Sequence, residues 1–390
     1  MSLKNSGLIV GIGETAVGKH PGRSALDLQA EAVQKALADA GIEKNKIDAI
    51  YALGSYIEPT QLHGLGVAEY LGIQPRFQEN VDVGGTVAFM SMILSAFAAI
   101  EEGRINIAVC VFGDNASTHR PPGTHGFLTQ MKQGTEEYEN PYGSSLVVSY
   151  ALLARRYLDL YGLEPEEVFG PVAITLRGHA QLNENAAYRK PITMDDYKSS
   201  PWIAEPFRRL DCSPVVDGAG AFVIVSRKVA QQMSLPFAPV SVLGVGTQVT
   251  HKIVSQTPDI PELGMADAGK RAFEEAGITQ KDVDLVTIHD GFTASVPITL
   301  EALGFCGLGE CGRLVADGGI SHTGDLPVNT HGGLLSQGHV GGVMHVLEAV
   351  RQLRGHAGER QVRDAEVAAV AGNGNIFSIC GMMLLAKGSN

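Results

Sequence analysis

The 390-residue sequence predicts an α/β fold in which one strand-and-helix unit occurs twice. Three observations predict it. The chain contains a gapless internal repeat, a nearly uncharged helix that begins after a glycine pair, and 44% hydrophobic against 18% charged residues. That composition is typical of a globular enzyme and excludes disordered and fibrous proteins, and the length is sufficient for two or three ordinary domains or one large duplicated one.

The repeat is the strongest of these signals. Residues 31–51 match residues 267–287 at a constant offset of 236. Each copy reads as an amphipathic helix that ends at a glycine, Gly41 or Gly277, and continues into a β run. A gapless match with a shared glycine cap indicates duplication.

The two copies extend outward along the chain. Residues 8–15 resemble residues 242–247, both as glycine-interrupted strands, and residues 107–115 resemble residues 367–375, both as buried strands that end in a glycine loop. Each half therefore reads strand, helix, strand, helix, strand. We expect an N-terminal half over 1–238, whose last strand is 218–226, and a C-terminal half over 239–390.

A long excursion interrupts the first half at about 116–215. It is rich in proline, tyrosine, histidine and arginine, and three helices are expected near 143–161, 165–182 and 193–201. Long insertions at strand ends usually shape a substrate site.

Two further helices are expected at 86–100 and 341–353, and the first follows Gly84-Gly85. A buried helix start directs free N–H groups and the positive end of the helix dipole into the interior. Such a place usually holds a nucleophile or an anion, whereas here the side chains of the glycine pair are hydrogens.

Charge and cysteine usage limit the function classes. A net charge of −12 argues against a nucleic-acid or anionic-membrane partner. The five cysteines are scattered, without CxxC or His/Cys ligand spacing, so we expect free thiols, no metal and a cytoplasmic location. The start, MSLKNSGLIVGIGE, predicts neither a signal peptide nor a membrane span.

Four motifs of the second half carry a family resemblance. They are HDGFT at 289–293, EALGF at 301–305, NTHGGLLSQGHVGG at 329–342 and GNGNIFS at 372–378. With the duplication, they resemble the thiolase superfamily of the sterol-carrier-protein-2 (lipid-transfer) type over the whole chain. The resemblance implies a duplicated αβαβα layered fold, a coenzyme A thioester as substrate without a bound cofactor, and a homodimer.

The positions of the family's thiols are glycines in this chain. The resemblance places the nucleophilic cysteine at Gly85, give or take one position, and the second thiol at Gly291 or Gly372. It implies that His339 corresponds to the histidine that activates the nucleophile, and His289 to the residue that polarises a carbonyl. Covalent acyl transfer needs a thiolate or an activated hydroxyl, whereas an enolate needs only donors aimed at its oxygen.

Further candidates surround these positions. His331 is either an acid/base or a plain loop histidine, Asp290 would orient a neighbour, and Thr86 is either a poor nucleophile or a helix cap. The backbone at Gly372 and the Asn373 side chain are candidate oxyanion donors. The basic residues that could meet the phosphates of coenzyme A, or simply be surface charges, are Arg208, Arg209, Arg120, Arg155 and Arg156.

Three functions remain open. One is an acyl-CoA enzyme that makes or breaks a C–C bond by enolate stabilisation without an acyl-cysteine, beside a small OB-fold partner protein as in some cysteine-less relatives. The second is a non-catalytic acyl-CoA or lipid-binding subunit, and the third is an acyltransferase with a non-standard nucleophile such as Thr86. The two retained histidines favour the first.

Overall fold

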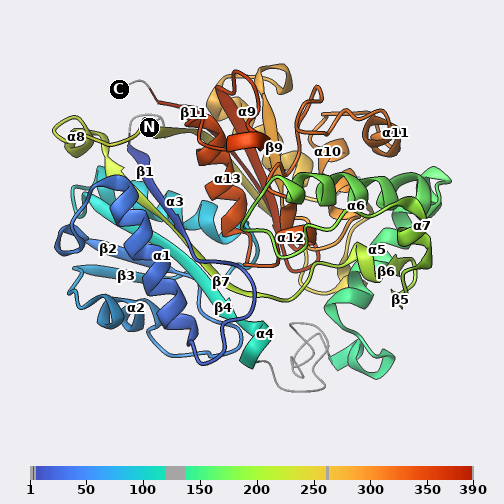
Figure 1. Ribbon diagram of the computed structural model, residues 1–390, viewed down its shortest axis with the longest axis horizontal. Coiled ribbons are helices and arrows are strands. Elements are labelled where there is room, and N and C mark those ends of the chain that lie inside the picture. Colours follow the sequence, from blue (N-terminus) through green and yellow to red (C-terminus); the bar gives the residue numbers. More distant parts are fainter. Residues whose placement is uncertain (1–2, 4–5, 120–136, 261–262, 389–390) are drawn as a thin grey trace.

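The computed structural model describes residues 3, 6–119, 137–260 and 263–388, and Figure 1 shows their arrangement. Its main feature is a nine-stranded sheet of order β3-β2-β4-β7-β1-β8-β11-β10-β9. The strands of the first half are β1 Gly7–Glu14, β2 Ala49–Ala52, β3 Phe77–Asn80, β4 Ile107–Asn115 and β7 Asp217–Ser226. Those of the second half are β8 Val240–Val249, β9 Leu285–Ile288, β10 Val367–Gly374 and β11 Ile379–Lys387.

The strand order is symmetric about the junction of β1 and β8, which pair antiparallel at Leu8 with Ser241 and Ile9 with Val240. Moving outward, β7 corresponds to β11, β4 to β10 and β2 to β9. A single bridge between Val286 and Val328 takes the place that β3 holds in the first half. This symmetry supports the predicted duplication, while the boundary at 238 and 239 stays a prediction.

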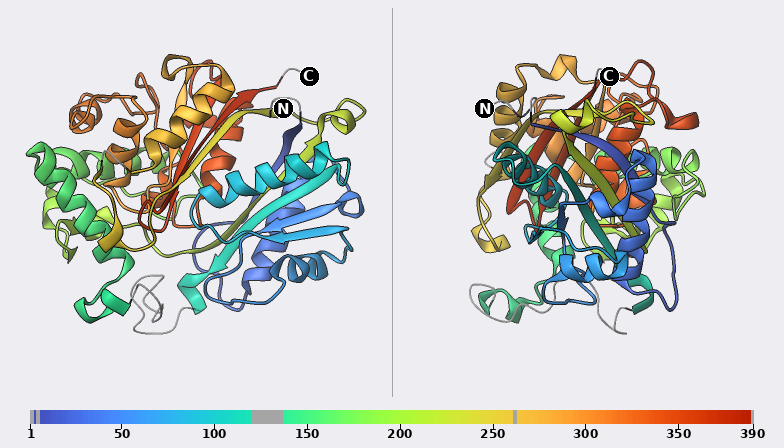
Figure 2. Two further views of the ribbon diagram at one scale, coloured as in Figure 1. Left: turned by 180° about the vertical axis from the view of Figure 1, so that it is seen from behind. Right: turned by 90° about the vertical axis from the view of Figure 1, so that its left-hand side faces the viewer.

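Helices form three layers with the strands between them: one outer layer on the first half, one outer layer on the second half, and a central layer. Helix α1 (Ala25–Ala40) covers β1, β4 and β7, α2 (His63–Leu71) lies beside it, and α9 (Met265–Ala276) covers β8 and β11. Helices α3 (Val87–Glu101) and α13 (Val343–Leu353) lie at the centre of the molecule and contact strands of both halves (Figure 1, Figure 2). The predicted αβαβα layering is therefore confirmed.

The central position of α3 follows from its sequence, VAFMSMILSAFAAIE, which carries no charge before Glu101. Most of its large side chains, among them Phe89 and Ile93, are buried and share one apolar core with α13. Burying each such side chain contributes roughly 1.5–3 kcal/mol. The start of α3 is thereby fixed between the two halves.

The excursion contains the three predicted helices, α5 (Leu146–Tyr161), α6 (Pro165–Gln181) and α7 (Met194–Ser199). It also contains α4 (Ala116–His119) and a hairpin of β5 (Trp202–Ala204) and β6 (Phe207–Arg208). Helix α6 packs on α11 (Cys311–Ala316) and α12 (Gly333–Ser336), and Figure 1 shows these helices beside the second half. The remaining helices are α8 (Arg227–Ala230) and α10 (Ser295–Ala302).

Within the described ranges, no helix has the length and apolar character that crossing a membrane requires.

Candidate active site

A cavity of about 1560 Å³ lies where both halves and the excursion meet. Its wall includes Gly84 and Gly85 before α3, His289 and Gly291 after β9, and His339 before α13. Small-molecule sites usually measure about 300–1,000 Å³, so this cavity has room for an extended ligand.

The imidazole rings of His289 and His339 lie close together on this wall. A Cβ atom built on Gly291 would lie 3.7 Å from Nε2 of His289 and 3.9 Å from Nε2 of His339. The two ring centroids are 5.5 Å apart, and the rings are nearly perpendicular. Because Gly291 has no side chain, both Nε2 atoms point at one open position in the cavity.

Both histidines are neutral near pH 7. Burial lowers the pKa of His289 to about 3, with a smaller contribution from His339. Burial also lowers the pKa of His339 to about 4. A neutral imidazole has one N–H donor and one acceptor nitrogen, so either ring can donate or accept a proton at the open position.

Thr86 lies behind His289 and not on the cavity wall. Its Oγ1 atom is 3.0 Å from Nδ1 of His289, and its side chain is fully buried. The hydroxyl is thus engaged on the far side of the imidazole. The structure contradicts the alternative in which Thr86 attacks a substrate.

The Gly85 position before α3 has no room for a side chain. Gly84 and Gly85 have φ values of +71° and +54°, which residues with side chains rarely adopt. A Cβ atom on Gly85 would lie 1.8 Å from the carbonyl oxygen of Asn373. The vacancy at Gly85 is therefore a property of the backbone as well as of the sequence.

Asn373 offers a donor to the cavity. The hydroxyl of Tyr150 hydrogen-bonds to its side-chain oxygen, which orients the amide. Its Nδ2 atom is buried and has no hydrogen-bond partner in the described part of the chain, and the residue lines the cavity. Gly372 does not line the cavity, because a Cβ atom there would lie 2.4 Å from Cβ of Thr86.

Asp290, predicted as a catalytic candidate that orients a neighbour, lies outside the cavity wall. Its carboxylate accepts the backbone N–H groups of Leu334 at 2.8 Å and Leu335 at 3.3 Å, at the start of α12. Burial raises its pKa to about 7. Through these two hydrogen bonds, Asp290 holds the motif loop that contains Leu334 and Leu335.

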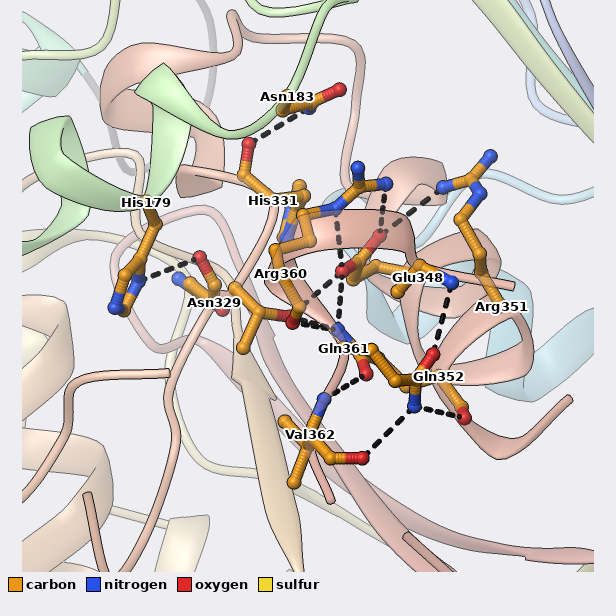
Figure 3. A network of polar contacts seen from close by, with 12 residues as sticks. His179, Asn183, Asn329, His331, Glu348, Arg351, Gln352, Arg360, Gln361 and Val362 are labelled. Carbon is orange, nitrogen blue, oxygen red and sulfur yellow. Dashed lines mark hydrogen bonds and ion pairs between the residues drawn. The ribbon is translucent and has the colours of Figure 1, made fainter. Parts of the chain in front are cut away.

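His331 is also outside the cavity, which favours the plain loop histidine over the acid/base among the two alternatives that the sequence left open. It is buried, its ring lies 5.0 Å from that of His345, and neither of its ring nitrogens has a hydrogen-bond partner among the described residues. Figure 3 shows it beside the ion pair of Glu348 and Arg360, whose Oε1 and Nε atoms are 3.0 Å apart. Its backbone carbonyl accepts from Asn183. This position favours packing.

The two predicted coenzyme A contacts differ. Arg209 is exposed and lines the cavity. Arg208 does not line it, because its guanidinium lies 3.8 Å from the ring centre of Trp202 and donates to the carbonyl of Ser200. Arg208 ends β6, whereas Arg209 begins the 3₁₀ turn Arg209–Asp211, and the RR motif alone does not predict this boundary.

The other basic residues that the sequence suggested as coenzyme A contacts are Arg155, Arg156 and Arg120. Arg155 and Arg156 form surface ion pairs with Glu205 and Asp259, and Arg120 lies outside the described residues. Two cations that sequence reasoning missed, Arg177 and Lys252, line the cavity.

Cys212 also lines the cavity, although it belongs to none of the sequence motifs. Burial, and then the charge of Asp211, raise the pKa of its thiol to about 12. It is protonated near pH 7 and is a poor nucleophile. Among the described residues, no group of three or more His, Cys, Asp or Glu side chains could hold a metal ion.

The chain is similar to known proteins over nearly its full length. The family described as Thiolase C-terminal domain-like matches residues 246–387. A steroid side-chain-cleaving aldolase of Thermomonospora curvata is 34% identical over 388 residues, covering 95% of this chain and 96% of the relative. The 17-hydroxy-3-oxo-4-pregnene-20-carboxyl-CoA lyase of Mycobacterium tuberculosis is 34% identical over 385 residues, covering 95% and 97%.

A solved structure, the Ltp2-ChsH2(DUF35) aldolase, shares the fold with a TM-score of 0.87 and 31% identity, covering 100% of both chains.

Proposed function

This chain belongs to the thiolase superfamily, among its sterol-carrier-protein-2-like members, and we propose that it cleaves a 3-hydroxyacyl-CoA by a retro-aldol step without an acyl-enzyme. The prediction of a thiolase-like enzyme that acts on a C–C bond of an acyl-CoA is confirmed by the relatives, two of which are named as an aldolase and a CoA lyase. The direction and the roles of the residues are our proposal.

The observation that carries the proposal is the convergence of the two Nε2 atoms, of His289 and His339, on one open position. Breaking a C–C bond next to a thioester needs a base for the hydroxyl proton and a donor for the enolate oxygen. Two neutral imidazoles supply one of each. Acyl transfer would need a nucleophile at the start of α3, where Gly85 leaves no room for one.

The proposed step conserves protons and electrons. One imidazole removes the proton of the 3-hydroxyl group, and the oxygen electrons form a carbonyl as the bond between C2 and C3 breaks. The electron pair of that bond moves into the thioester and forms an enolate. The other imidazole and the amide of Asn373 bind the enolate oxygen, and the proton then returns to C2 to give the shortened acyl-CoA.

The cavity supports a bulky acyl group as substrate. Its volume of about 1560 Å³ exceeds what a short acyl chain and the thioester need. Two relatives are named for steroid and pregnene-carboxyl substrates, and we propose a polycyclic acyl-CoA for this chain. Arg209 and Lys252, on the wall of the cavity, would meet the phosphates of coenzyme A.

We also propose an assembly. Strand β3 is an edge strand of the sheet and carries the exposed Phe77, so it can pair with a second copy to form a homodimer. The solved aldolase that resembles this chain is named for two components, Ltp2 and ChsH2(DUF35), and we propose that a small OB-fold partner protein acts beside this chain. We propose that this assembly works in the cytoplasm.

The test is incubation with a series of 3-hydroxyacyl-CoA thioesters of increasing bulk, with and without a DUF35 protein. We expect a shortened acyl-CoA and a free carbonyl product, measured by mass spectrometry, and no mass increase of the intact protein. A stable acyl adduct would contradict the proposal, and so would tight binding without any product.

A further inference from the structure

Thr86, at the start of α3, does not form the side-chain hydrogen bond that is usual at this position. A threonine that precedes a helix normally accepts an N–H bond from the first turn. Thr86 holds that place but makes no side-chain capping bond. Its hydroxyl instead meets Nδ1 of His289 at 3.0 Å, across 203 residues of sequence.

Two glycines of the second half leave room for this side chain. A Cβ atom on Gly342 would lie 2.3 Å from Oγ1 of Thr86 and 2.9 Å from Nδ1 of His289. A Cβ atom on Gly372 would lie 2.4 Å from Cβ of Thr86. The threonine and the imidazole therefore meet in a fitted space and not by a chance surface contact.

The direction of this hydrogen bond follows from the partners. Within the described chain, the hydrogen bond of the Thr86 side chain is the one to His289. If Nδ1–H donated to it, the hydroxyl hydrogen would be buried without an acceptor, at a cost of roughly 1–3 kcal/mol. If the hydroxyl donates, Nδ1 is the acceptor and the ring proton lies on Nε2.

We propose that Thr86 is a positioning residue that holds His289 in the Nε2–H tautomer, with this N–H directed into the cavity. This inference rests on the proposed function and deepens it, because it distinguishes the two imidazoles. His289 is then the donor to the thioester oxygen, and His339 is the base that takes the hydroxyl proton. The start of α3 therefore contributes the Thr86 hydroxyl on the Nδ1 side of His289, away from the cavity, and contributes no nucleophile to the cavity.

The first test uses the free, unmodified protein. In a nitrogen NMR spectrum of ¹⁵N-histidine-labelled protein near pH 7, the signals of His289 are assigned by their loss in His289→Gln. We expect Nε2 to have the protonated shift and Nδ1 the unprotonated one. The reverse assignment overturns the proposal, and because no substrate is present, it does so independently of any lyase activity.

The second test removes the hydroxyl. Thr86→Val keeps the shape of the side chain, and we expect the Nε2–H population to fall and kcat to drop about 10²-fold, as when one oxyanion donor is lost, with KM within a few-fold. Thr86→Ser keeps the hydroxyl and should retain the tautomer and kcat within about threefold.

A matched control is Thr299→Val, which removes another fully buried hydroxyl that has no partner among the described residues and lies away from the cavity. It should leave the tautomer and kcat unchanged. If Thr86→Val folds and keeps both the wild-type tautomer and kcat, or if Thr86→Ser loses them, the assignment of Thr86 is wrong.

Discussion

Each of the two central helices follows a pair of glycines with positive φ, and the side chains beside the two pairs differ. Helix α3 follows Gly84 and Gly85, with φ of +71° and +54°, and α13 follows Gly341 and Gly342, with φ of +55° and +84°. Each pair turns the chain sharply into a helix that is enclosed by both halves. Both helices are thus entered through a glycine pair, which precedes the N-cap residue Thr86 in α3 and includes the N-cap residue Gly342 in α13.

The side chains beside the two helix starts differ. At α3 the residue after the glycine pair is Thr86, whose side chain reaches His289 in the other half. At α13 the residue before the helix is Gly342, where a Cβ atom would overlap that same Thr86 side chain. The start of α3 thus supplies the Thr86 side chain, and Gly342 at the start of α13 leaves space for it. A duplicated fold can therefore contain a site whose residues are not duplicated.

The largest expected effect comes from removing the histidines. His289→Ala removes the donor and His339→Ala removes the base, and each should lower kcat by about 10²-fold or more with acyl-CoA affinity within a few-fold. Since both act on one reaction step, the double variant should lose much less than the product of the two single losses. Steady-state kinetics with the best 3-hydroxyacyl-CoA measure this.

Full activity in both single variants would show that neither histidine takes part in the reaction. Binding of acyl-CoA by the wild type without any turnover would instead favour the non-catalytic binding subunit that the sequence left open.

Adding a methyl group at Gly342, at the start of α13, should have the next largest effect. In Gly342→Ala, the new methyl group would overlap Oγ1 of Thr86, so we expect a loss of about 2 kcal/mol beyond the strain of a positive φ, together with a loss of activity. Gly358→Ala is the matched control, since its φ is +62° and nothing lies within 4 Å of its Cβ position. Denaturant midpoints compare the two, and equal losses would contradict the fitted space.

Placing a thiol at each candidate position sharpens the comparison further. Gly85→Cys should fold poorly, because its Cβ would lie 1.8 Å from a backbone oxygen. Gly291→Cys meets only ordinary contacts at 3.7 Å or more and should fold normally. Its thiol faces two imidazoles, so its alkylation should be faster than that of any native cysteine, as mass spectrometry after iodoacetamide can show.

A well-folded Gly85→Cys protein with a reactive thiol would mean that the backbone at the start of α3 relaxes more than the structure indicates.

The smallest effect concerns the wild type. Alkylation with iodoacetamide near pH 7 should leave activity within about twofold, because the thiol of Cys212 has a pKa of about 12 and is almost fully protonated. Rapid inactivation that acyl-CoA prevents would show that Cys212 takes part in the reaction.

The sequence predicted the parts of this molecule that repeat or follow a period. The gapless repeat predicted α1 and α9, and the uncharged run after Gly85 predicted a central α3. The motifs also predicted His289 and His339, which the structure brings to one open position in the cavity.

Other features depend on side-chain direction or on contacts between distant residues. Asp290 and Arg208 each adjoin a cavity residue in sequence yet do not line the cavity, and the sequence does not give the direction in which each side chain leaves the backbone. Cys212 and Lys252 reach the wall only through the folding of the excursion and of the loop after β8. No local pattern signals the contact of Thr86 with a residue in the other half.

That contact has a consequence for the folding of the chain. Thr86 and His289 are 203 residues apart, and long-range contacts of this kind form only after large loops have closed. A chain that has formed its helices and strands but has not yet brought these residues together contains both imidazoles and still lacks the oriented donor. Recovery of activity during refolding should therefore lag behind recovery of the circular dichroism signal, so that turnover reports the last step of assembly.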